Sequence, residues 1–138
     1  MVTFDYLTKI YYKDIDQMGV VYYARYFEFF EQARTELLCD IGLIVTKIEN
    51  DGYFIPVVSA TCIYKEGAKF EDEIIVRTMI KEVPHARMKI EYEVYNPVCP
   101  KFNIIQRDKN YGVCTLGQMH HIMEEGWTGW WSPYFLKR

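Results

Sequence analysis

Residues 13–36 read KDIDQMGVVYYARYFEFFEQARTE, and along this stretch the spacing of the apolar side chains changes from one period to another. From about Ala24 to Ile41, apolar residues recur at steps of three and four, which predicts an amphipathic helix of about five turns. Gly42 follows directly and is a typical helix terminator. The polar segment DIDQMG before the helix predicts a tight turn in which Gly19 adopts a positive φ angle. The stretch therefore joins an earlier element to one long helix.

The segments on either side of this stretch carry the two-residue alternation of β-strands. Residues 3–12 have four apolar side chains on one face, which predicts a half-buried strand. These four are Phe4, Tyr6, Ile10 and Tyr12. After a short connector at residues 43–52, strands are predicted at 53–65, 73–83 and 87–95, with weaker signals at 102–107 and 111–121. This order predicts an α+β fold, a single domain over residues 1–138 in which one helix crosses the apolar face of an antiparallel sheet.

The composition narrows the classes of function. The formal charge of the 138 residues is -3 and no run of lysine and arginine is present, which argues against a nucleic-acid-binding protein. The N-terminal segment lacks the continuous apolar run of a signal peptide or a membrane helix, so we expect no membrane span and a cytoplasmic location. Half of the residues are hydrophobic, which is enough to bury a substantial core.

The spacing of cysteine and histidine gives no sign of a metal centre. The four cysteines are scattered without a CxxC pair, which favours reduced thiols over a disulfide framework. Cys114, His120 and His121 come nearest to a metal-ligand group, but they are too few and their spacing fits no zinc pattern. We therefore expect neither a metal nor a cofactor.

Two motifs in the opening stretch carry a family resemblance. The first is a D-x-D-x-x-G-x-V turn at residues 14–21, followed by an aromatic pair, and the second is an E-x-A-R-T-E helix body at residues 31–36. With these motifs the chain resembles the hotdog-fold acyl-CoA thioesterases, and more narrowly the 4-hydroxybenzoyl-CoA thioesterase-like family with its Tol–Pal-associated thioesterase branch. The pattern is clear over residues 1–96 and atypical over 97–138. The resemblance implies a hotdog fold, an antiparallel sheet wrapped around one long central helix, and hydrolysis of an acyl-CoA thioester to free acid and CoA.

The resemblance also implies roles for individual residues. Asp16 matches the family's catalytic aspartate, acting either as nucleophile or as general base on water. The backbone N–H of Tyr23 matches the group that polarises the thioester carbonyl at the helix start, and Gly19 permits the close turn between the two. Asp14 better fits a turn or capping carboxylate, and an Asx-turn role for both aspartates is the alternative. Further substrate contacts are expected from Val21, Tyr22, Tyr26 and Lys65.

Other functions of the same fold stay open at this point. A non-hydrolytic acyl-CoA or acyl-carrier binding protein would keep the pocket without turnover, and an acyl-carrier-protein thioesterase would share the motifs. A hydratase would need a histidine at the helix–strand corner, where His85, His120 and His121 do not lie. We expect a homo-oligomer, either a dimer or a dimer of dimers with the active site at the dimer interface, because such a sheet leaves an edge or face to be covered.

Overall fold

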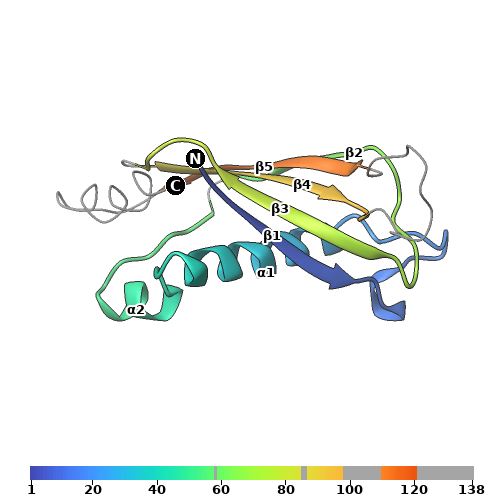
Figure 1. Ribbon diagram of the computed structural model, residues 1–138, viewed down its shortest axis with the longest axis horizontal. Helices are drawn as coiled ribbons and strands as arrows, with labels where there is room; N and C mark the ends of the chain where they lie inside the picture. Colours follow the sequence, from blue (N-terminus) through green and yellow to red (C-terminus); the bar gives the residue numbers. More distant parts are fainter. Residues whose placement is uncertain (58, 85–86, 98–109, 121–138) are drawn as a thin grey trace.

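The computed structural model describes residues 1–57, 59–84, 87–97 and 110–120, in which one helix lies against an antiparallel sheet (Figure 1). The strand order across the sheet is β1-β3-β4-β5-β2, and each neighbouring pair is antiparallel. In chain order the elements are β1 (Val2–Lys9), the 3₁₀ turn η1 (Tyr12–Asp14), α1 (Arg25–Asp40), α2 (Val45–Asn50), β2 (Thr61–Tyr64), β3 (Glu73–Ile80), β4 (Arg87–Tyr95) and β5 (Asn110–His120). Because β1 and β2 lie at opposite edges, the chain between them, which contains α1, has to cross the sheet.

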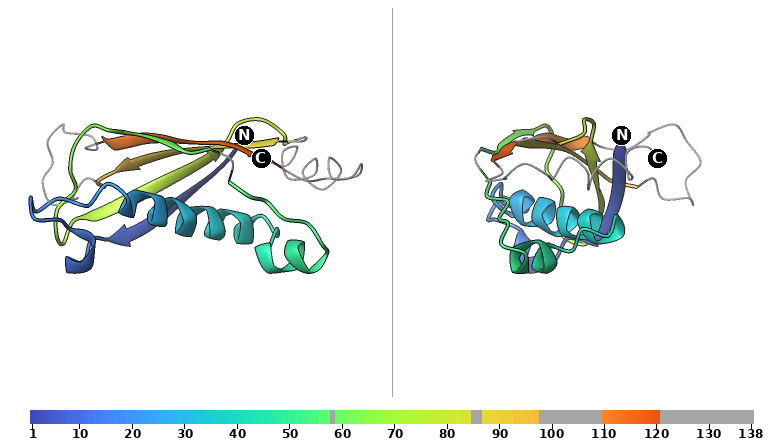
Figure 2. Two further views of the ribbon diagram at one scale, coloured as in Figure 1. Left: turned by 180° about the vertical axis from the view of Figure 1, so that it is seen from behind. Right: turned by 90° about the vertical axis from the view of Figure 1, so that its left-hand side faces the viewer.

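The core lies between α1 and the inner face of the sheet, which curves around the helix (Figure 2). Alternate residues of β3 and β4 are buried there, as their two-residue period predicts. Phe30 of α1 packs on Tyr92 of β4 with ring centroids 4.7 Å apart, and Arg34 Nη1 donates a hydrogen bond to the Tyr92 hydroxyl at 3.4 Å. The buried residues of α1 are Tyr26, Phe29, Phe30, Ala33, Leu37 and Leu38.

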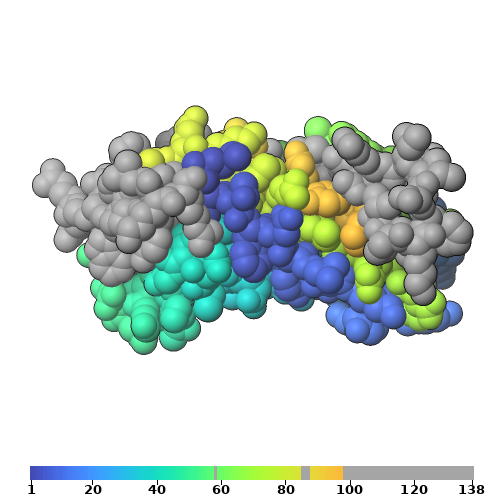
Figure 3. All heavy atoms as spheres, in the orientation of Figure 1, coloured from blue at the N-terminus to red at the C-terminus, as the bar shows by residue number. Residues whose placement is uncertain are grey.

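Contacts on both faces of β1 hold this edge strand in place. On the inner side the Tyr6 hydroxyl donates a hydrogen bond to Gln32 Oε1 of α1 at 3.1 Å. On the outer side the guanidinium of Arg77, in the paired strand β3, donates two hydrogen bonds of 2.8 and 2.9 Å to the carboxylate of Asp5. In the space-filling view the side chains of β1 meet those of α1 along a continuous boundary (Figure 3). These contacts therefore fix the position of β1, the strand from which the chain enters the corner that leads to α1.

Most of the predicted elements are confirmed. The predicted helix agrees with α1 to within one residue at each end, and the connector after it contains the short helix α2. The segments 73–83, 87–95 and 111–121 are confirmed as β3, β4 and β5, although β3 ends before the predicted boundary, at Ile80. The strand predicted at 102–107 lies outside the described residues. Within the described ranges, no helix is both long enough and apolar enough to span a bilayer.

Two other predictions about the extent of strands are wrong. The first strand ends at Lys9, and Tyr12 is exposed because the chain turns into η1 at that residue. The strand predicted at residues 53–65 is limited to Thr61–Tyr64. Pro56 lacks the N–H that a strand interior requires, and the chain must first return from the end of α2 to the far edge of the sheet.

Candidate active site

The corner between β1 and α1 is held together mainly by backbone hydrogen bonds. Asp16 N–H donates to the Val20 carbonyl at 2.9 Å and Gly19 N–H donates back to the Asp16 carbonyl at 3.0 Å. Gly19 has a φ angle of 77°, the positive value predicted for it, which a residue with a Cβ adopts only at a cost. Val21 N–H donates to the Ala68 carbonyl at 2.8 Å, so the turn is also tied to the loop between β2 and β3.

The approach of this loop depends on a second glycine. A Cβ built on Gly67 would lie only 2.6 Å from Cγ1 of Val20, so the loop comes close to the turn because residue 67 has no side chain. No local pattern in the sequence pointed to this contact, since it joins two turns that are distant along the chain.

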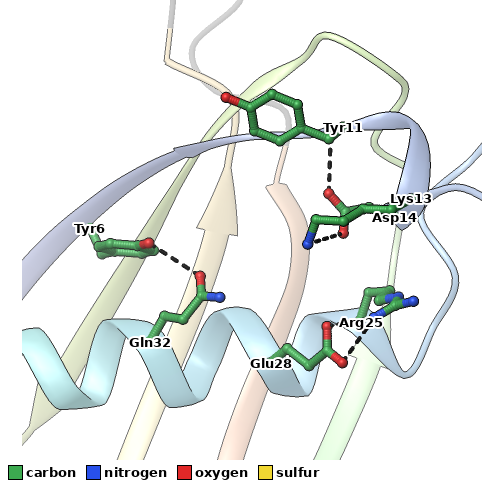
Figure 4. Close-up of polar contacts among 7 residues, drawn as sticks. All are labelled: Tyr6, Tyr11, Lys13, Asp14, Arg25, Glu28 and Gln32. Carbon is green, nitrogen blue, oxygen red and sulfur yellow. Dashed lines mark hydrogen bonds and ion pairs between the residues drawn. The ribbon is translucent and has the colours of Figure 1, made fainter.

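Asp14 has the structural role predicted for it. Its side chain is buried, with the residue only 1% exposed, and Oδ2 accepts a hydrogen bond from Tyr11 N–H at 3.0 Å. Its carbonyl accepts a hydrogen bond from Tyr22 N–H at 2.9 Å, so the same residue connects η1 to the segment that leads into the helix. Figure 4 shows the Asp14 carboxylate between Tyr11 and Lys13, whose Nζ lies 3.5 Å from Oδ1. Asp14 therefore caps a turn and is shielded from a ligand by burial.

Asp16 is only half-buried and faces two hollows of the surface. Its Oδ1 accepts a hydrogen bond from Met18 N–H at 2.8 Å, which is the Asx-turn geometry named as the alternative. That bond occupies one oxygen, and among the described residues no donor is bonded to Oδ2. The turn therefore orients the carboxylate and leaves its second oxygen available for chemistry.

Tyr23 lies just before α1 and is 59% exposed. Its carbonyl accepts a hydrogen bond from the Tyr64 hydroxyl of β2 at 2.8 Å. Its backbone N–H has no acceptor in the part of the chain that the structure describes. The hydrogen bonds of the helix begin only after it, with the bond from Arg25 N–H to the Tyr22 carbonyl, so the Tyr23 N–H is one of the unpaired donors of a helix start. An N–H in this position can donate to an oxygen of a ligand.

The first of the two hollows at Asp16, which we call the tyrosine hollow, is a cavity of about 300 Å³. Its lining includes four of the residues predicted to contact the substrate or polarise its carbonyl, together with Tyr64, which sequence reasoning missed. The five are Val21, Tyr23, Tyr26, Tyr64 and Lys65. The Tyr64 ring contacts those of Tyr26 and Tyr23 with centroids 5.5 and 6.3 Å apart, in edge-to-face orientation.

Tyr26 forms the buried wall of this hollow. Its hydroxyl accepts a hydrogen bond from Ala68 N–H at 3.4 Å. Burial raises the pKa of the Tyr26 phenol, an effect that the hydrogen bond from Ala68 partly opposes. The phenol is therefore protonated at neutral pH, and it supplies an aromatic surface rather than a charge.

The second hollow, which we call the cationic hollow, has a volume of about 690 Å³. Asp16, Gly19 and Tyr22 line it, so it contains the remaining predicted site residues. Lys13 and Arg25 also line it, and sequence reasoning had not assigned them to the site although they flank the turn motif. Within the described residues, no group of three or more His, Cys, Asp or Glu side chains is arranged to hold a metal ion.

Comparisons with known proteins show which family the chain matches. A family model described as the thioesterase-like superfamily matches residues 11–126, which extends beyond residue 96, where the motif pattern weakens. The putative acyl-CoA thioesterase YneP of Bacillus subtilis is 34% identical over 86 residues, 62% of this chain and 62% of that protein. The acyl-CoA thioesterase YbgC of Haemophilus influenzae is 37% identical over 89 residues, 64% of this chain and 65% of that protein. The matched segments thus span less than two thirds of these relatives.

Solved structures agree on the fold over more of the chain. A DHNA-CoA thioesterase from Staphylococcus aureus superimposes with a TM-score of 0.80 at 20% identity, covering 99% of this chain and 93% of that one. A mutant 4-hydroxybenzoyl-CoA thioesterase complexed with 4-hydroxybenzoyl-CoA gives a TM-score of 0.75 at 18% identity, covering 91% and 88%. At these identities the likeness establishes the fold alone. Together with the family match it shows that the chain belongs to the thioesterase-like superfamily and has the hotdog fold.

Proposed function

We propose that this protein hydrolyses an acyl-CoA thioester to the free acid and CoA. The observation that carries the proposal is the juxtaposition at the β1–α1 corner: the half-buried Asp16 carboxylate and the Tyr23 residue with its unbonded N–H line the same hollow. A thioesterase needs an acid or base and a group that stabilises negative charge on the carbonyl oxygen, and this corner holds one of each. The names of the two matched relatives, an acyl-CoA thioesterase and a putative acyl-CoA thioesterase, support the same reaction.

In the proposed mechanism the thioester carbonyl oxygen accepts a hydrogen bond from Tyr23 N–H, which stabilises the charge that develops in the transition state. The Asp16 carboxylate then acts in one of two ways. It attacks the carbonyl carbon to form an anhydride that water hydrolyses, or it removes a proton from the water that attacks the carbon directly. In both cases the C–S bond breaks, CoA leaves as the thiolate, and a proton from water converts it to the thiol. Val21, Tyr22, Tyr26 and Lys65 complete the substrate-binding part of the proposal.

We further propose that the single domain over residues 1–138 works as a homodimer or dimer of dimers in the cytoplasm, with the site near the dimer interface. The support is the edge strand β2, which pairs with β5 on one side. Ile63 of β2 is 64% exposed, and it lies beside the exposed Tyr64 that contacts Tyr23. An apolar edge strand of this kind invites pairing with another copy. Light scattering coupled to size-exclusion chromatography tests this, and a strictly monomeric protein would contradict it.

Hydrolysis of an acyl-CoA panel, followed with a thiol-detecting reagent, tests the activity. The wild type is compared with Asp16→Asn, which keeps the side-chain oxygen that Met18 N–H bonds and removes the charge. We expect Asp16→Asn to lower kcat by about 10²–10⁴-fold. Asp51→Asn is the matched control, because Asp51 is exposed at the end of α2, and it should leave kcat unchanged.

The outcomes separate the proposed enzyme from its rivals. Full activity of Asp16→Asn would remove Asp16 from the mechanism. A wild type that binds CoA esters without turnover would indicate a binding protein of the same fold. Turnover of acyl-carrier-protein thioesters far above that of the matching CoA esters would indicate a carrier-protein thioesterase.

A further inference from the structure

A thioester placed at Asp16 has two unequal arms, and the structure offers two unequal hollows for them. If the carbonyl lies between the Asp16 carboxylate and Tyr23 N–H, the acyl group and the CoA arm must leave that point in different directions. Asp16 belongs to the lining of both the tyrosine hollow and the cationic hollow. The two hollows therefore share the residue that is proposed to act on the thioester. This inference rests on the thioesterase activity proposed above.

Charge and size distinguish the two hollows. The tyrosine hollow has a volume of about 300 Å³, and Lys65, the cation in the described part of its lining, is accompanied there by Glu66 and Asp16. The cationic hollow has a volume of about 690 Å³, and Lys13 and Arg25 outnumber Asp16 in its lining. The CoA arm is the longer of the two and carries phosphates with several negative charges, which are attracted to a site with an excess of cations.

Both cations of the second hollow are available to a ligand. Lys13 is 69% exposed on its side chain, and its Nζ lies 3.5 Å from the nearest oxygen of the buried Asp14. Among the described residues Arg25 is paired with Glu28 through Nη1, at 2.9 Å from each carboxylate oxygen, and Figure 4 shows this pair on the first turn of α1. A guanidinium has five N–H donors, so those on Nε and Nη2 are left for a phosphate.

An aromatic surface lies beside these cations. Tyr12 lines the cationic hollow, and its ring packs edge-to-face on Phe70 with centroids 4.8 Å apart. Both rings are exposed, so a planar base can stack on them without displacing the core. A nucleotide carries both a planar base, which can stack on aromatic rings, and phosphates, which bind cations.

We propose that the cationic hollow binds the phosphate-bearing nucleotide arm of CoA through Lys13 and Arg25, and that the tyrosine hollow receives the acyl group. Lys13 and Arg25 contribute to recognition of the leaving group and take no part in the proton transfers.

The test compares two substrates with the same acyl group: the CoA thioester and the N-acetylcysteamine thioester, which lacks the nucleotide and its phosphates. The variants are Lys13→Gln and Arg25→Gln, which keep an extended side chain without the charge. Lys65→Gln reports on the opposite hollow, and Lys47→Gln, on the exposed surface of the distant helix α2, is the charge-matched control. Steady-state kcat and KM are measured for each pair at low and moderate ionic strength.

We expect Lys13→Gln and Arg25→Gln each to raise KM for the CoA thioester about tenfold, with kcat and the truncated substrate nearly unchanged. Added salt should weaken wild-type recognition of the CoA ester and affect these two variants less, because fewer charges remain to be screened. Lys47→Gln should behave as wild type with both substrates.

Three results would overturn the inference. Equal losses on both substrates would mean that Lys13 and Arg25 act on the structure of the corner. A CoA-specific loss in Lys65→Gln alone would mean that the two arms are reversed, and no effect in any variant would place the nucleotide elsewhere. If the wild type hydrolyses neither thioester, the proposed activity fails, and calorimetric titration of free CoA into wild type and Lys13→Gln still tests the hollow by itself: equal affinity for the two would reject it.

Discussion

The two ends of α1 differ in how their apolar side chains are covered. At the C-terminal end Leu37, Leu38 and Ile41 are buried, as are Leu43 and Ile48 of the segment that folds back against the helix. At the N-terminal end large side chains remain exposed although they lie close together; they are Met18, Tyr22, Tyr23 and Tyr64. The last apolar residues of α1 are thus covered by the chain itself, whereas the N-terminal end presents apolar surface that a substrate or another subunit can cover.

Backbone hydrogen bonds show the same contrast. The C-terminal end closes with a Schellman motif, in which Gly42 N–H donates to the Cys39 carbonyl at 3.0 Å and Leu43 N–H to the Leu38 carbonyl at 2.7 Å. Gly42 makes this possible with a φ angle of 82°. The N-terminal end has no side-chain cap at Ala24, and the nearby Tyr23 N–H has no acceptor within the described residues. The C-terminal end of α1 is therefore capped by its own chain, whereas the N-terminal end leaves a backbone donor that could bond to a ligand.

The largest effect on stability should come from the covered end. Leu37→Ala removes a fully buried side chain between α1 and the sheet and should lower the free energy of unfolding by about 2–5 kcal/mol. The rate per folded molecule should hardly change, because the cavity lies far from Asp16. Urea unfolding measures the first quantity and activity corrected for the folded fraction measures the second. A loss below about 1 kcal/mol would show that this end is not closely packed.

Asp14→Ala should have the next largest effect and separates the two aspartates. It leaves Tyr11 N–H without its acceptor at the turn η1, which should lower the free energy of unfolding by about 2 kcal/mol. Asp16→Asn should change it by less than about 0.5 kcal/mol, because the Met18 hydrogen bond has an acceptor in both forms. Urea unfolding of the two variants side by side gives the answer, and equal losses would mean that both carboxylates are structural.

The helix, most strands and the motif residues could be predicted from the sequence, because they depend on the local spacing of residues. The helix period and Gly42 predicted α1 to within one residue, and the D-x-D turn led to Asp16 and Gly19 at one corner. The contact between Tyr64 and Tyr23 was missed because it joins β2 to the helix start across 41 residues, and it forms only when the sheet is assembled. Tyr12 was misplaced because the alternation gives no sign that Asp14 caps a turn there.

Gly19→Ala should have a smaller effect that isolates backbone strain. A Cβ at this position would meet nothing within 4 Å, so the cost comes only from the positive φ angle, about 1 kcal/mol of unfolding free energy. Gly19→Asn should cost less, since asparagine tolerates this conformation better. Thermal or urea unfolding of both variants checks the order. A larger loss for asparagine than for alanine would mean that space, and not φ, limits the turn.

Tyr64→Phe should have the smallest effect on stability and the most local effect on chemistry. It keeps the ring contacts with Tyr23 and Tyr26 and removes the hydrogen bond to the Tyr23 carbonyl. Since that bond orients the residue whose N–H is proposed to polarise the substrate, we expect kcat to fall about threefold with KM unchanged, and the unfolding free energy to fall by less than about 1 kcal/mol.

Tyr6→Phe provides the matched control for this prediction. It also removes one tyrosine hydroxyl that bonds to α1, through Gln32 at 3.1 Å, but on the side of the helix that faces β1. The two variants should lose similar stability, while only Tyr64→Phe lowers kcat. If both lower kcat equally, general loosening of α1 explains the effect. If neither lowers kcat, the backbone of the turn is sufficient to hold the Tyr23 amide in place. The two ends of α1 would then differ in burial but not in a side-chain contribution to catalysis.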